Sequence, residues 1–289
     1  MNFFLFYVFF IMAGCTTSGD TSSVASKNVT QTPNLAKSTP HPSYSIVAEL
    51  FPGIRGITFD ANQTLYISDT EGTFHPSKKI YSLKKPYDGE LTALPMVFAM
   101  PTGLAFKDNN LFVADHGKSE VFQFSSSFEK IRRWKADSPI ALLDTPKGLL
   151  SLSSGGAVEL LRSNGKVDQI FSGLVNPTAF TYTSDGHLWV AESGSTFVKP
   201  RVSKRDFKGL ITKTIDHTWR KPSGLAVDKF HQLWIADPEN NAVYVSLDAK
   251  LSNGDSVFNT PAFFTQFSST ELLLLEDGNR PRLIKVSIE

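Results

Sequence analysis

The sequence predicts an all-β fold, a six-bladed β-propeller, on three observations. Short segments rich in aromatic and β-branched residues alternate with turns that contain Gly, Pro, Asn and Asp, as in antiparallel sheets. The best-defined group of such strands runs from Lys221 to Asp248, and related groups recur at intervals of about 40 residues. That period suits a four-stranded propeller blade, which cannot bury both of its faces without copies of itself on either side.

The group at Lys221–Asp248 defines the repeat. A Pro-Ser-Gly turn at 222–224 leads into an extended run at 225–227, and further strands follow at 232–236 and 242–247. Six positions open the repeats: Arg55, Pro101, Pro139, Pro177, Pro222 and Pro261. The repeats that begin at Pro139 and Pro261 match the pattern less well.

Each repeat is expected to end in a fourth, outer strand. These strands are predicted at Leu91–Met100, Phe128–Lys135, Val167–Phe171, Leu210–Trp219 and Asp255–Phe258. The last repeat offers only three strands, whereas an additional strand, Tyr44–Phe51, precedes the first repeat. We therefore predict that residues 44–51 supply the outer strand of the last blade and close the ring, which protects its open strand edges.

The repeat resembles an NHL repeat. The residues that carry the resemblance are Pro-x-Gly-Leu-Ala-Val-Asp at 222–228, Leu-Trp-Ile-Ala-Asp at 233–237 and Asn-Asn-Ala-Val-Tyr-Val at 240–245. The resemblance covers about residues 44 to 289 and is clear again at 101–124. Proteins with related repeats include gluconolactonase and regucalcin-like metallohydrolases, peptidylglycine lyases and streptogramin lyases. The resemblance implies a propeller, but this architecture does not fix a function.

The N-terminus predicts export and a lipid anchor. Residues 1–14 form an uncharged apolar stretch that is too short to span a bilayer but suits a signal peptide. Residues 11–15, Ile-Met-Ala-Gly-Cys, resemble a bacterial lipobox, which implies lipidation of Cys15. Cys15 is the only cysteine of the chain, so it cannot form an internal disulfide. The alternative is a plain secretory signal with an incidental cysteine, because the segment before the apolar stretch lacks Lys and Arg.

Three segments follow from this pattern: a signal peptide (1–14), a lipidated cysteine with a disordered tether (15–42) and the propeller (43–289). Residues 16–42 are rich in Ser and Thr and contain no aromatic residue, so they cannot bury enough apolar surface to become ordered. We expect a protein of the bacterial cell envelope, anchored at the outer membrane or its periplasmic face, or at the cell surface. The formal net charge of +1 gives no basic field for nucleic acid, which is not expected as a partner.

Two long insertions mark one face of the ring as the place for binding. They are predicted at Thr70–Lys79 and Ser193–Asp206, and both follow the second strand of a blade. A basic run at 199–208 begins within the second insertion. It is either a solvated loop or a contact with an anionic partner or lipid headgroups. The residues of such a contact would be Lys199, Arg201, Lys204 and Arg205.

The predicted second strands end at Asp69, Asp115, Ser154, Glu192, Asp237 and Glu276. A ring of carboxylates could bind a cation. Its recurrence in nearly every blade favours a structural role instead, because a catalytic site breaks the symmetry of the ring. We expect each carboxylate to accept hydrogen bonds from the backbone of the turn that follows it.

No metal or cofactor is predicted. In the metallohydrolase relatives an acidic or amide ligand precedes the Gly of the opening turn in one blade, with Asn and Glu ligands in others. The corresponding positions here are Arg55, Thr102, Ile140, Thr178, Ser223 and Ala262. None of these residues is a good ligand for a divalent cation, which prefers carboxylate and carbonyl oxygen.

The lyases of this type use histidine. Of the six histidines, only His75 and His116 belong to the loop-rich face, and Asp115 is next to His116. No spacing of the histidines suggests a metal site. These three residues are the catalytic candidates if the protein is an enzyme.

The sequence thus predicts a membrane-anchored, exported propeller that acts as a binding or scaffolding module for an envelope protein, peptide or glycan on the loop-rich face. The alternative is a lactonase- or lyase-type enzyme with a degenerate metal site, and a third possibility is an assembly subunit without a small ligand. Binding alone predicts neither metal nor turnover. The enzyme predicts a stoichiometric cation and loss of activity in His116→Ala or Asp115→Ala.

Overall fold

The computed structural model describes residues 42–70, 78–247, 250–251, 258–268, 270–278 and 280–288. The chain divides into two units, Met1–Thr39 and Pro40–Glu289, and the described residues belong to the second. The predicted signal peptide, the lipidation site Cys15, the tether up to residue 41 and His75 therefore lie outside the described residues. Within the described part of the chain, no helix has the length and apolar character needed to cross a membrane.

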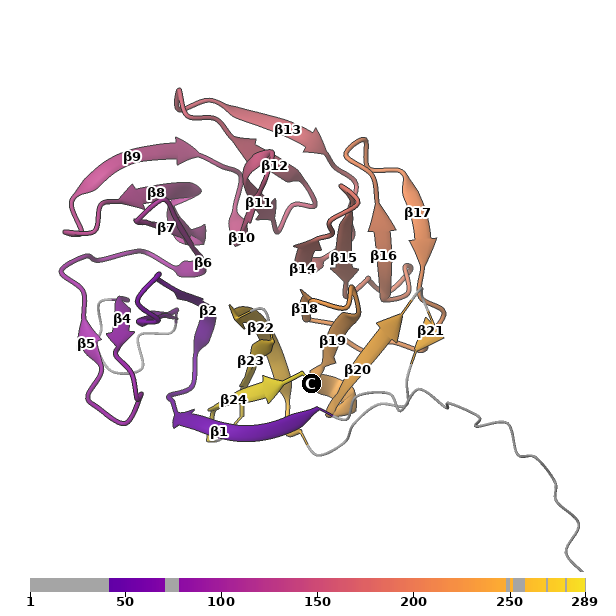
Figure 1. The fold of residues 1–289 in the computed structure, drawn as a ribbon. Coiled ribbons are helices and arrows are strands. Elements are labelled where there is room, and N and C mark those ends of the chain that lie inside the picture. The colour runs from indigo at the N-terminus through magenta and orange to yellow at the C-terminus, as the bar shows by residue number, and fades with distance from the viewer. Residues whose placement is uncertain are drawn as a thin grey trace, which may run out of the picture. The chain divides into compact units, whose positions relative to one another are not determined.

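Six four-stranded antiparallel sheets form a ring around a central axis, which confirms the predicted six-bladed β-propeller (Figure 1). Blade 1 consists of β2 (Ile54–Phe59), β3 (Leu65–Asp69), β4 (Ile80–Leu83) and β5 (Thr92–Ala93). Blade 2 consists of β6 (Pro101–Lys107), β7 (Asn110–Asp115), β8 (Glu120–Phe124) and β9 (Lys130–Lys135). Blade 3 consists of β10 (Pro139–Thr145), β11 (Gly148–Ser153), β12 (Val158–Leu161) and β13 (Val167–Phe171).

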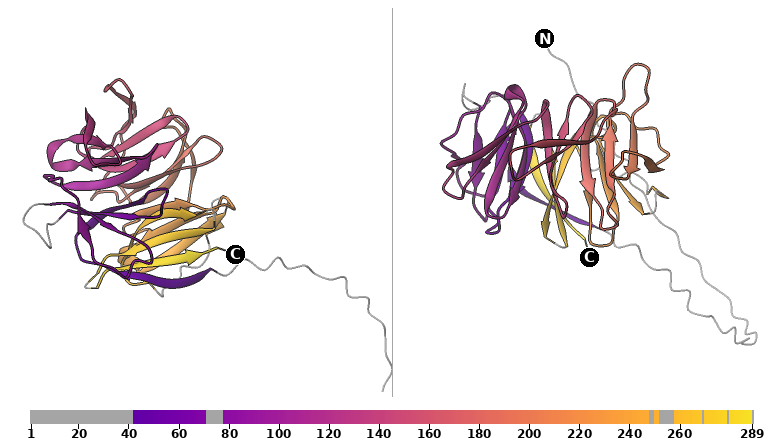
Figure 2. Two further views of the ribbon diagram at one scale, coloured as in Figure 1. Left: turned by 60° about the vertical axis from the view of Figure 1, so that its left-hand side comes forward. Right: turned by 90° about the horizontal axis from the view of Figure 1, so that it is seen from above.

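Blades 4 to 6 complete the ring. Blade 4 consists of β14 (Pro177–Tyr182), β15 (Leu188–Glu192), β16 (Arg201–Arg205) and β17 (Ile211–Thr214). Blade 5 consists of β18 (Gly224–Val227), β19 (Leu233–Asp237), β20 (Ala242–Leu247) and β21 (Lys250–Leu251). Blade 6 consists of β22 (Pro261–Ser268), β23 (Glu271–Glu276), β24 (Arg282–Ser287) and β1 (Ser43–Glu49). Two short 3-10 helices, η1 (His116–Lys118) and η2 (Pro238–Asn240), follow second strands. Seen edge-on, the blades form a disc (Figure 2).

The ring is closed by its N-terminal strand, as predicted. Blade 6 has the order β1-β24-β23-β22, so the first strand of the propeller pairs with the last (Figure 1). The pairing runs from Ser43 opposite Ser287 to Glu49 opposite Arg282. The register shifts between Ile46 and Ala48, and Ile46 is 57% exposed.

Three sequence predictions need correction. The outer strand of blade 5 is β21 at Lys250–Leu251, whereas it was expected at 255–258; of that range, Phe258 lies before β22 and is buried, and 255–257 lie outside the described residues. Outer strands β5 and β17 are much shorter than predicted. The opening position of blade 1 is Ile54 rather than Arg55, because Ile54 pairs with Asp69 as Pro101 pairs with Asp115.

The core lies between the blades. The second strand of each blade is almost wholly buried, because neighbouring sheets cover both of its faces. Trp189 of blade 4 belongs to a cluster shared with blade 5, and Trp234 of blade 5 packs with residues of blade 6. The two tryptophans therefore join blades.

Glycine in the opening turn allows the innermost strands to touch. A Cβ atom on Gly103 would lie 2.5 Å from the Cα atom of Ala141 in the next blade. A Cβ on Gly224 would lie 2.6 Å from the carbonyl oxygen of Ala262. Both contacts are too short for any side chain, so these two positions require glycine and fix the spacing around the axis.

Candidate functional site

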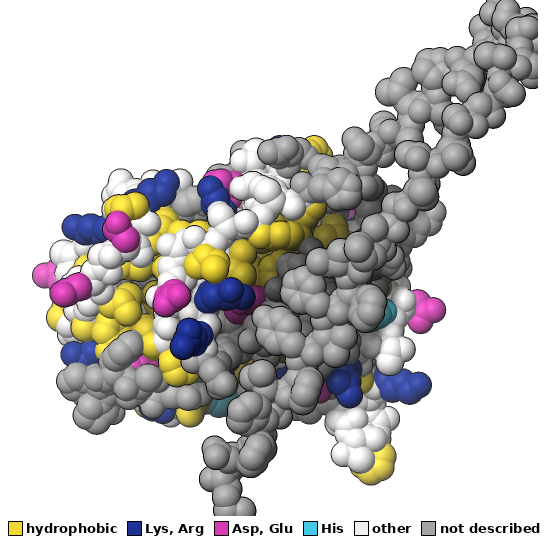
Figure 3. Space-filling model, turned by 90° about the horizontal axis from the view of Figure 1, so that it is seen from below, with side chains coloured by type: hydrophobic (Ala, Val, Ile, Leu, Met, Phe, Trp, Pro, Cys, Tyr) yellow, Lys and Arg dark blue, Asp and Glu magenta, His cyan; other side chains and the backbone are white. Residues whose placement is uncertain are grey.

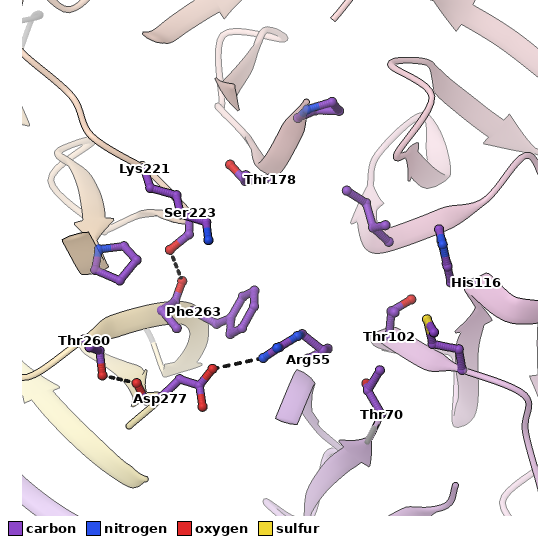
Figure 4. Close-up of a pocket in the computed structure, with 15 residues that line it drawn as sticks. Arg55, Thr70, Thr102, His116, Thr178, Lys221, Ser223, Thr260, Phe263 and Asp277 are labelled. Atoms are coloured by element: carbon purple, nitrogen blue, oxygen red, sulfur yellow. Dashed lines mark hydrogen bonds and ion pairs between the residues drawn. The ribbon is translucent and has the colours of Figure 1, made fainter. Parts of the chain in front are cut away.

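A cavity of about 490 Å³ opens at one end of the central axis (Figure 4). All six residues that precede the glycine position of the opening turn line it: Arg55, Thr102, Ile140, Thr178, Ser223 and Ala262. Most of the remaining lining comes from the segments that enter the first strands and follow the second strands, among them Lys221, His116 and Asp277. The cavity thus lies on the face where the sequence analysis expected binding.

Three hydroxyl groups of the cavity lining join a blade to the next one along the chain. Thr102 Oγ1 donates to the carbonyl oxygen of Pro139 at 2.9 Å, and Ser223 Oγ donates to that of Ala262 at 2.9 Å. Thr178 Oγ1 does the same with Pro222 at 2.5 Å. Because the hydroxyl protons are used by the fold, these groups can offer a ligand only their oxygen lone pairs.

The closing seam of the ring is joined by an ion pair instead of a hydroxyl. Arg55 of blade 1 donates from Nη1 to Asp277 Oδ2 of blade 6 at 3.0 Å (Figure 4). The side chains of Arg55 and Asp277 are 39% and 31% exposed, so the pair is partly solvated. Asp277 is the carboxylate of the cavity lining, and Arg55 neutralises it.

Lys221 gives the lining an ammonium group that is available to a ligand. It lies on the segment that enters β18, next to the Ser223 bridge (Figure 4). In the described part of the chain its ammonium makes no salt bridge, whereas its backbone N–H donates to Asp237 Oδ1 at 3.0 Å. That hydrogen bond fixes the base of the side chain beside the cavity.

Phe263 supplies the aromatic surface of the cavity. It follows Ala262 in β22, at the position that holds glycine in blades 1, 2 and 5. Its ring lies between Arg55 and Ser223 (Figure 4). The break in the repeat pattern at this residue therefore makes the cavity asymmetric.

His116 lies on the opposite side of the cavity from Lys221 (Figure 4). It begins η1 directly after β7, and its backbone N–H donates to the carbonyl oxygen of Met100 at 2.9 Å. Its Nδ1 atom is buried and has no hydrogen-bond partner within the described residues. The structure thus places one of the two candidate histidines at the cavity.

The carboxylates at the ends of the second strands are buried and hold the fold together. Asp115 accepts from the backbone N–H groups of Ala99 at 3.0 Å and Met100 at 2.8 Å. Asp237 accepts from those of Arg220 and Lys221 at 2.9 and 3.0 Å. The structural role expected for these carboxylates is therefore confirmed, but the predicted hydrogen-bond donors were wrong. The backbone N–H donors lie in the segment that enters the first strand of the same blade, and not in the turn that follows the carboxylate.

Blade 3 departs from this rule. Pro139 pairs with Ser153, so Ser153, rather than Ser154, is the equivalent of Asp115. The carboxylate comes here from the entering segment, because Ser153 Oγ donates to Asp137 Oδ2 at 3.4 Å. In blade 3 the second strand therefore donates the hydrogen bond and the entering segment accepts it, whereas in blade 2 the entering segment donates and the second strand accepts.

The middle of the basic run is a strand and not a loop, which corrects the sequence analysis. Residues 201–205 form strand β16, and Arg205 is buried. Arg201 Nε and Arg205 Nη2 donate to Glu192 Oε2 at 2.6 and 2.9 Å. Lys204 Nζ pairs with Asp185 Oδ2 at 2.5 Å. Binding by these residues stays a prediction, and Lys199 is the one of the four that is exposed.

Burial of Glu192 raises its pKa, but the hydrogen bonds from Arg201, the backbone of Val175 and Arg205 outweigh this effect and lower the pKa overall. The charged Glu192 carboxylate therefore accepts four hydrogen bonds inside blade 4. In the described residues, no group of three or more His, Cys, Asp or Glu side chains is placed to hold a metal ion.

Comparison with known sequences finds no relatives: no protein-family model matches the chain, and no curated protein matches it significantly. Solved structures do resemble it. A virginiamycin B lyase from Staphylococcus aureus has a TM-score of 0.62 at 12% identity, covering 86% of this chain and 100% of its own. A gluconolactonase from Xanthomonas campestris has a TM-score of 0.67 at 17% identity, covering 90% and 94%.

A Bacteroides thetaiotaomicron protein of unknown function has a TM-score of 0.68 at 14% identity, covering 86% of this chain and 76% of its own. The chain is thus similar to six-bladed β-propellers whose members include lactonases and lyases. At these identities the likeness shows the fold alone.

Sequence reasoning missed Lys221, Phe263 and Asp277. Lys221 directly precedes the opening Pro-Ser-Gly turn, and Phe263 replaces its glycine in the last repeat. Both features can be seen in the sequence when the six repeats are written one below another. The pairing of Asp277 with Arg55 was not, because it joins the two ends of the ring across 222 residues of sequence.

Proposed function

We propose that the protein is an exported, lipid-anchored binding module that captures an envelope protein, peptide or glycan at the face with the central cavity. The observation that carries this proposal is the lining of the cavity. Phe263 and Lys221 offer an aromatic ring and an ammonium group, while the described residues hold no cluster of metal-binding side chains.

The cavity suits the end of a larger ligand. Its volume of about 490 Å³ lies within the range of small-molecule sites, so it has room for one sugar ring or one or two amino-acid side chains. An aromatic face packs on a sugar or an apolar side chain. The Lys221 ammonium attracts a carboxylate or another acceptor oxygen. The hydroxyl groups that join the blades accept hydrogen bonds from ligand hydroxyl or amide groups.

The envelope location in this proposal rests on the N-terminal sequence. A lipidated Cys15 would fix the chain to a membrane, and the Ser- and Thr-rich segment at 16–42 would act as a flexible tether of roughly 30 Å. The cavity would then meet ligands close to that membrane. Incorporation of labelled palmitate into the chain, lost in Cys15→Ser, is the expected result for the anchor.

A capture experiment tests the binding function. The propeller, immobilised and exposed to envelope extract, is expected to retain a ligand that Lys221→Gln loses and that Phe263→Ala retains less well. Phe230→Ser is the matched control, because Phe230 is an exposed aromatic residue in the β18–β19 turn, at the other end of the blade from the cavity. Equal retention by the wild type and by both cavity variants would refute the proposed site.

One observation favours the enzyme as a second candidate. The imidazole of His116 lies in the cavity wall with an unpartnered buried Nδ1 among the described residues, and histidine is the commonest general acid or base. A virginiamycin B lyase structure with quinupristin, at 14% identity, is described as inactivated by a histidine-to-alanine change. Turnover of a lactone or of quinupristin that disappears in His116→Ala would favour this candidate over binding alone.

A further inference from the structure

The loop between β15 and β16, residues 193–200, carries Phe197, which is 95% exposed. The other exposed large hydrophobic side chains of the described residues reach 63% at most. We call this segment the Phe197 loop. It follows the second strand of blade 4, so it lies on the face with the cavity. Figure 2 shows a loop of this colour that projects from the disc, and the space-filling view in Figure 3 shows a projection that ends in a hydrophobic side chain.

The Phe197 loop is held rigidly by hydrogen bonds of its own. The backbone N–H of Ser195 donates to the carbonyl oxygen of Val198 at 2.7 Å, and Val198 N–H donates back to Ser195 at 3.2 Å. At the base of the loop, Asn176 Nδ2 donates to the carbonyl oxygen of Gly194 at 2.6 Å. Phe197 is thus presented on a preformed turn.

The conformation of the Phe197 loop requires glycine at position 194. The φ of Gly194 is +70°, and a Cβ atom there would lie 2.2 Å from the carbonyl oxygen of Val198. Any other residue would open the turn. A loop held in one conformation loses less conformational freedom on binding than a flexible one.

We propose that the Phe197 loop inserts into a lipid surface, with the Phe197 ring at the boundary between headgroups and acyl chains and Lys199 beside anionic headgroups. A stable protein interface buries about 800 Å² on each partner. A single ring at the end of a projection is far from that area. A lipid surface needs no complementary pocket, and it favours aromatic rings at headgroup depth with Lys beside them.

Lys199 is the neighbour that this contact requires. It is exposed, whereas Arg201 on the same segment is engaged by Glu192. The basic run of the sequence therefore contributes an exposed ammonium near the tip and structural charges behind it. Insertion would bring the cavity rim of blade 4 to the membrane, so the ligand of the proposed module would be met at the bilayer surface. This goes beyond the proposed function, which requires only a tether.

The test uses a chain that begins at residue 43. It contains all strands of the six blades, including β1, and it omits the predicted signal peptide and lipid site. The result is therefore independent of the proposed anchor and of the proposed cavity ligand. Binding is measured by co-sedimentation with vesicles of phosphatidylethanolamine and phosphatidylglycerol, for the wild type, Phe197→Ser and the control Phe230→Ser.

We expect Phe197→Ser to weaken partition about tenfold, which corresponds to about 1.4 kcal/mol, and Phe230→Ser to bind as the wild type does. Lys199→Gln should weaken binding to these vesicles and leave binding to phosphatidylcholine vesicles unchanged. Phe197→Trp should keep the affinity and place a tryptophan within reach of brominated acyl chains. The four native tryptophans are at most 7% exposed, so quenching reports on position 197.

Three results would overturn the proposal. The first is an absence of vesicle binding by the wild-type chain, which would leave the loop as a contact for a protein partner. The second is equal binding by the wild type and Phe197→Ser. The third is tryptophan emission in the Phe197→Trp variant that brominated lipid does not quench. Melting curves of each variant exclude misfolding as the cause, since Phe197 has almost no packing to lose.

Discussion

Replacing Glu192 by alanine should destabilise the propeller by about 3–5 kcal/mol, the usual cost of breaking a buried ion pair. Glu192 is 1% exposed and accepts from Val175 N–H at 2.8 Å, from Arg201 twice and from Arg205 Nη2 at 2.9 Å. Arg201 is 31% exposed and can regain water, whereas Arg205 at 7% cannot. Most of the cost therefore comes from the guanidinium of Arg205, which would be buried without its partner.

The assay is urea unfolding followed by tryptophan fluorescence, with the melting temperature as a second measure. Glu120→Ala is the matched control: Glu120 accepts from Arg133 at 2.9 Å, but Arg133 is 63% exposed, so its loss should cost at most about 1 kcal/mol. The double change Glu192→Met with Arg205→Met should recover part of the stability, because no unpaired charge remains buried: Arg201, which also loses its partner, is 31% exposed and is solvated. A loss below about 1 kcal/mol in Glu192→Ala would refute this reasoning.

The effect of Glu192 also depends on pH. Since its folded-state pKa is lowered, its contribution is present above the ordinary value of 4.5 and is lost as the pH falls through the folded-state pKa. The difference in stability between the wild type and Glu192→Ala should therefore shrink in acid. A difference that stays constant from pH 7 to the acid limit of folding would contradict the pairing.

Three further outcomes follow from the structure. A chain that begins at residue 52 lacks β1, so it should melt at a sharply lower temperature and aggregate, and an unchanged melting curve would disprove closure by this strand. Burial raises the pKa of Glu159, so this residue favours the fold below its ordinary pKa and loses that contribution as the pH rises. Glu159→Gln should accordingly raise the melting temperature at pH 7 more than at pH 4, and the reverse order would be inconsistent with this. Thr178→Val removes the hydrogen bond to Pro222, so denaturant unfolding should give a free energy of unfolding about 1 kcal/mol below that of the wild type. An unchanged free energy of unfolding would contradict a stabilising role for this bond.

The ring and its closure could be predicted from the sequence because they depend on repetition. A period near one blade and a missing outer strand are properties of the whole chain, and a wrong boundary in one repeat does not change them. Short outer strands were harder. Strand β21 is two residues long and has no hydrophobic pattern of its own, so its position is set by its pairing with β20.

The basic run misled the sequence analysis for a physical reason. Strand β16 carries Arg, Lys and Arg, which are typical of a solvated loop. It is a strand because Glu192 on β15, paired opposite Arg201, supplies the countercharge inside the blade. Such a partner is visible only once the two strands are placed side by side.

The cavity could be predicted in part. The positions of Arg55, Thr102, Thr178 and Ser223 around the axis follow from the register of the repeats. The bonds of their side chains do not, because each reaches into a neighbouring blade or across the seam. The exposure of Phe197 likewise depends on the turn formed by Gly194 and Ser195, which no pattern of hydrophobic residues indicates.

The proposed function has this propeller bind its ligand through the cavity without a resident divalent cation. Elemental analysis of the purified chain from residue 43, dialysed without chelator, tests it most directly. No stoichiometric metal is expected. Stoichiometric calcium or zinc would contradict it, and would direct attention to His116 and Asp115 as parts of an enzyme.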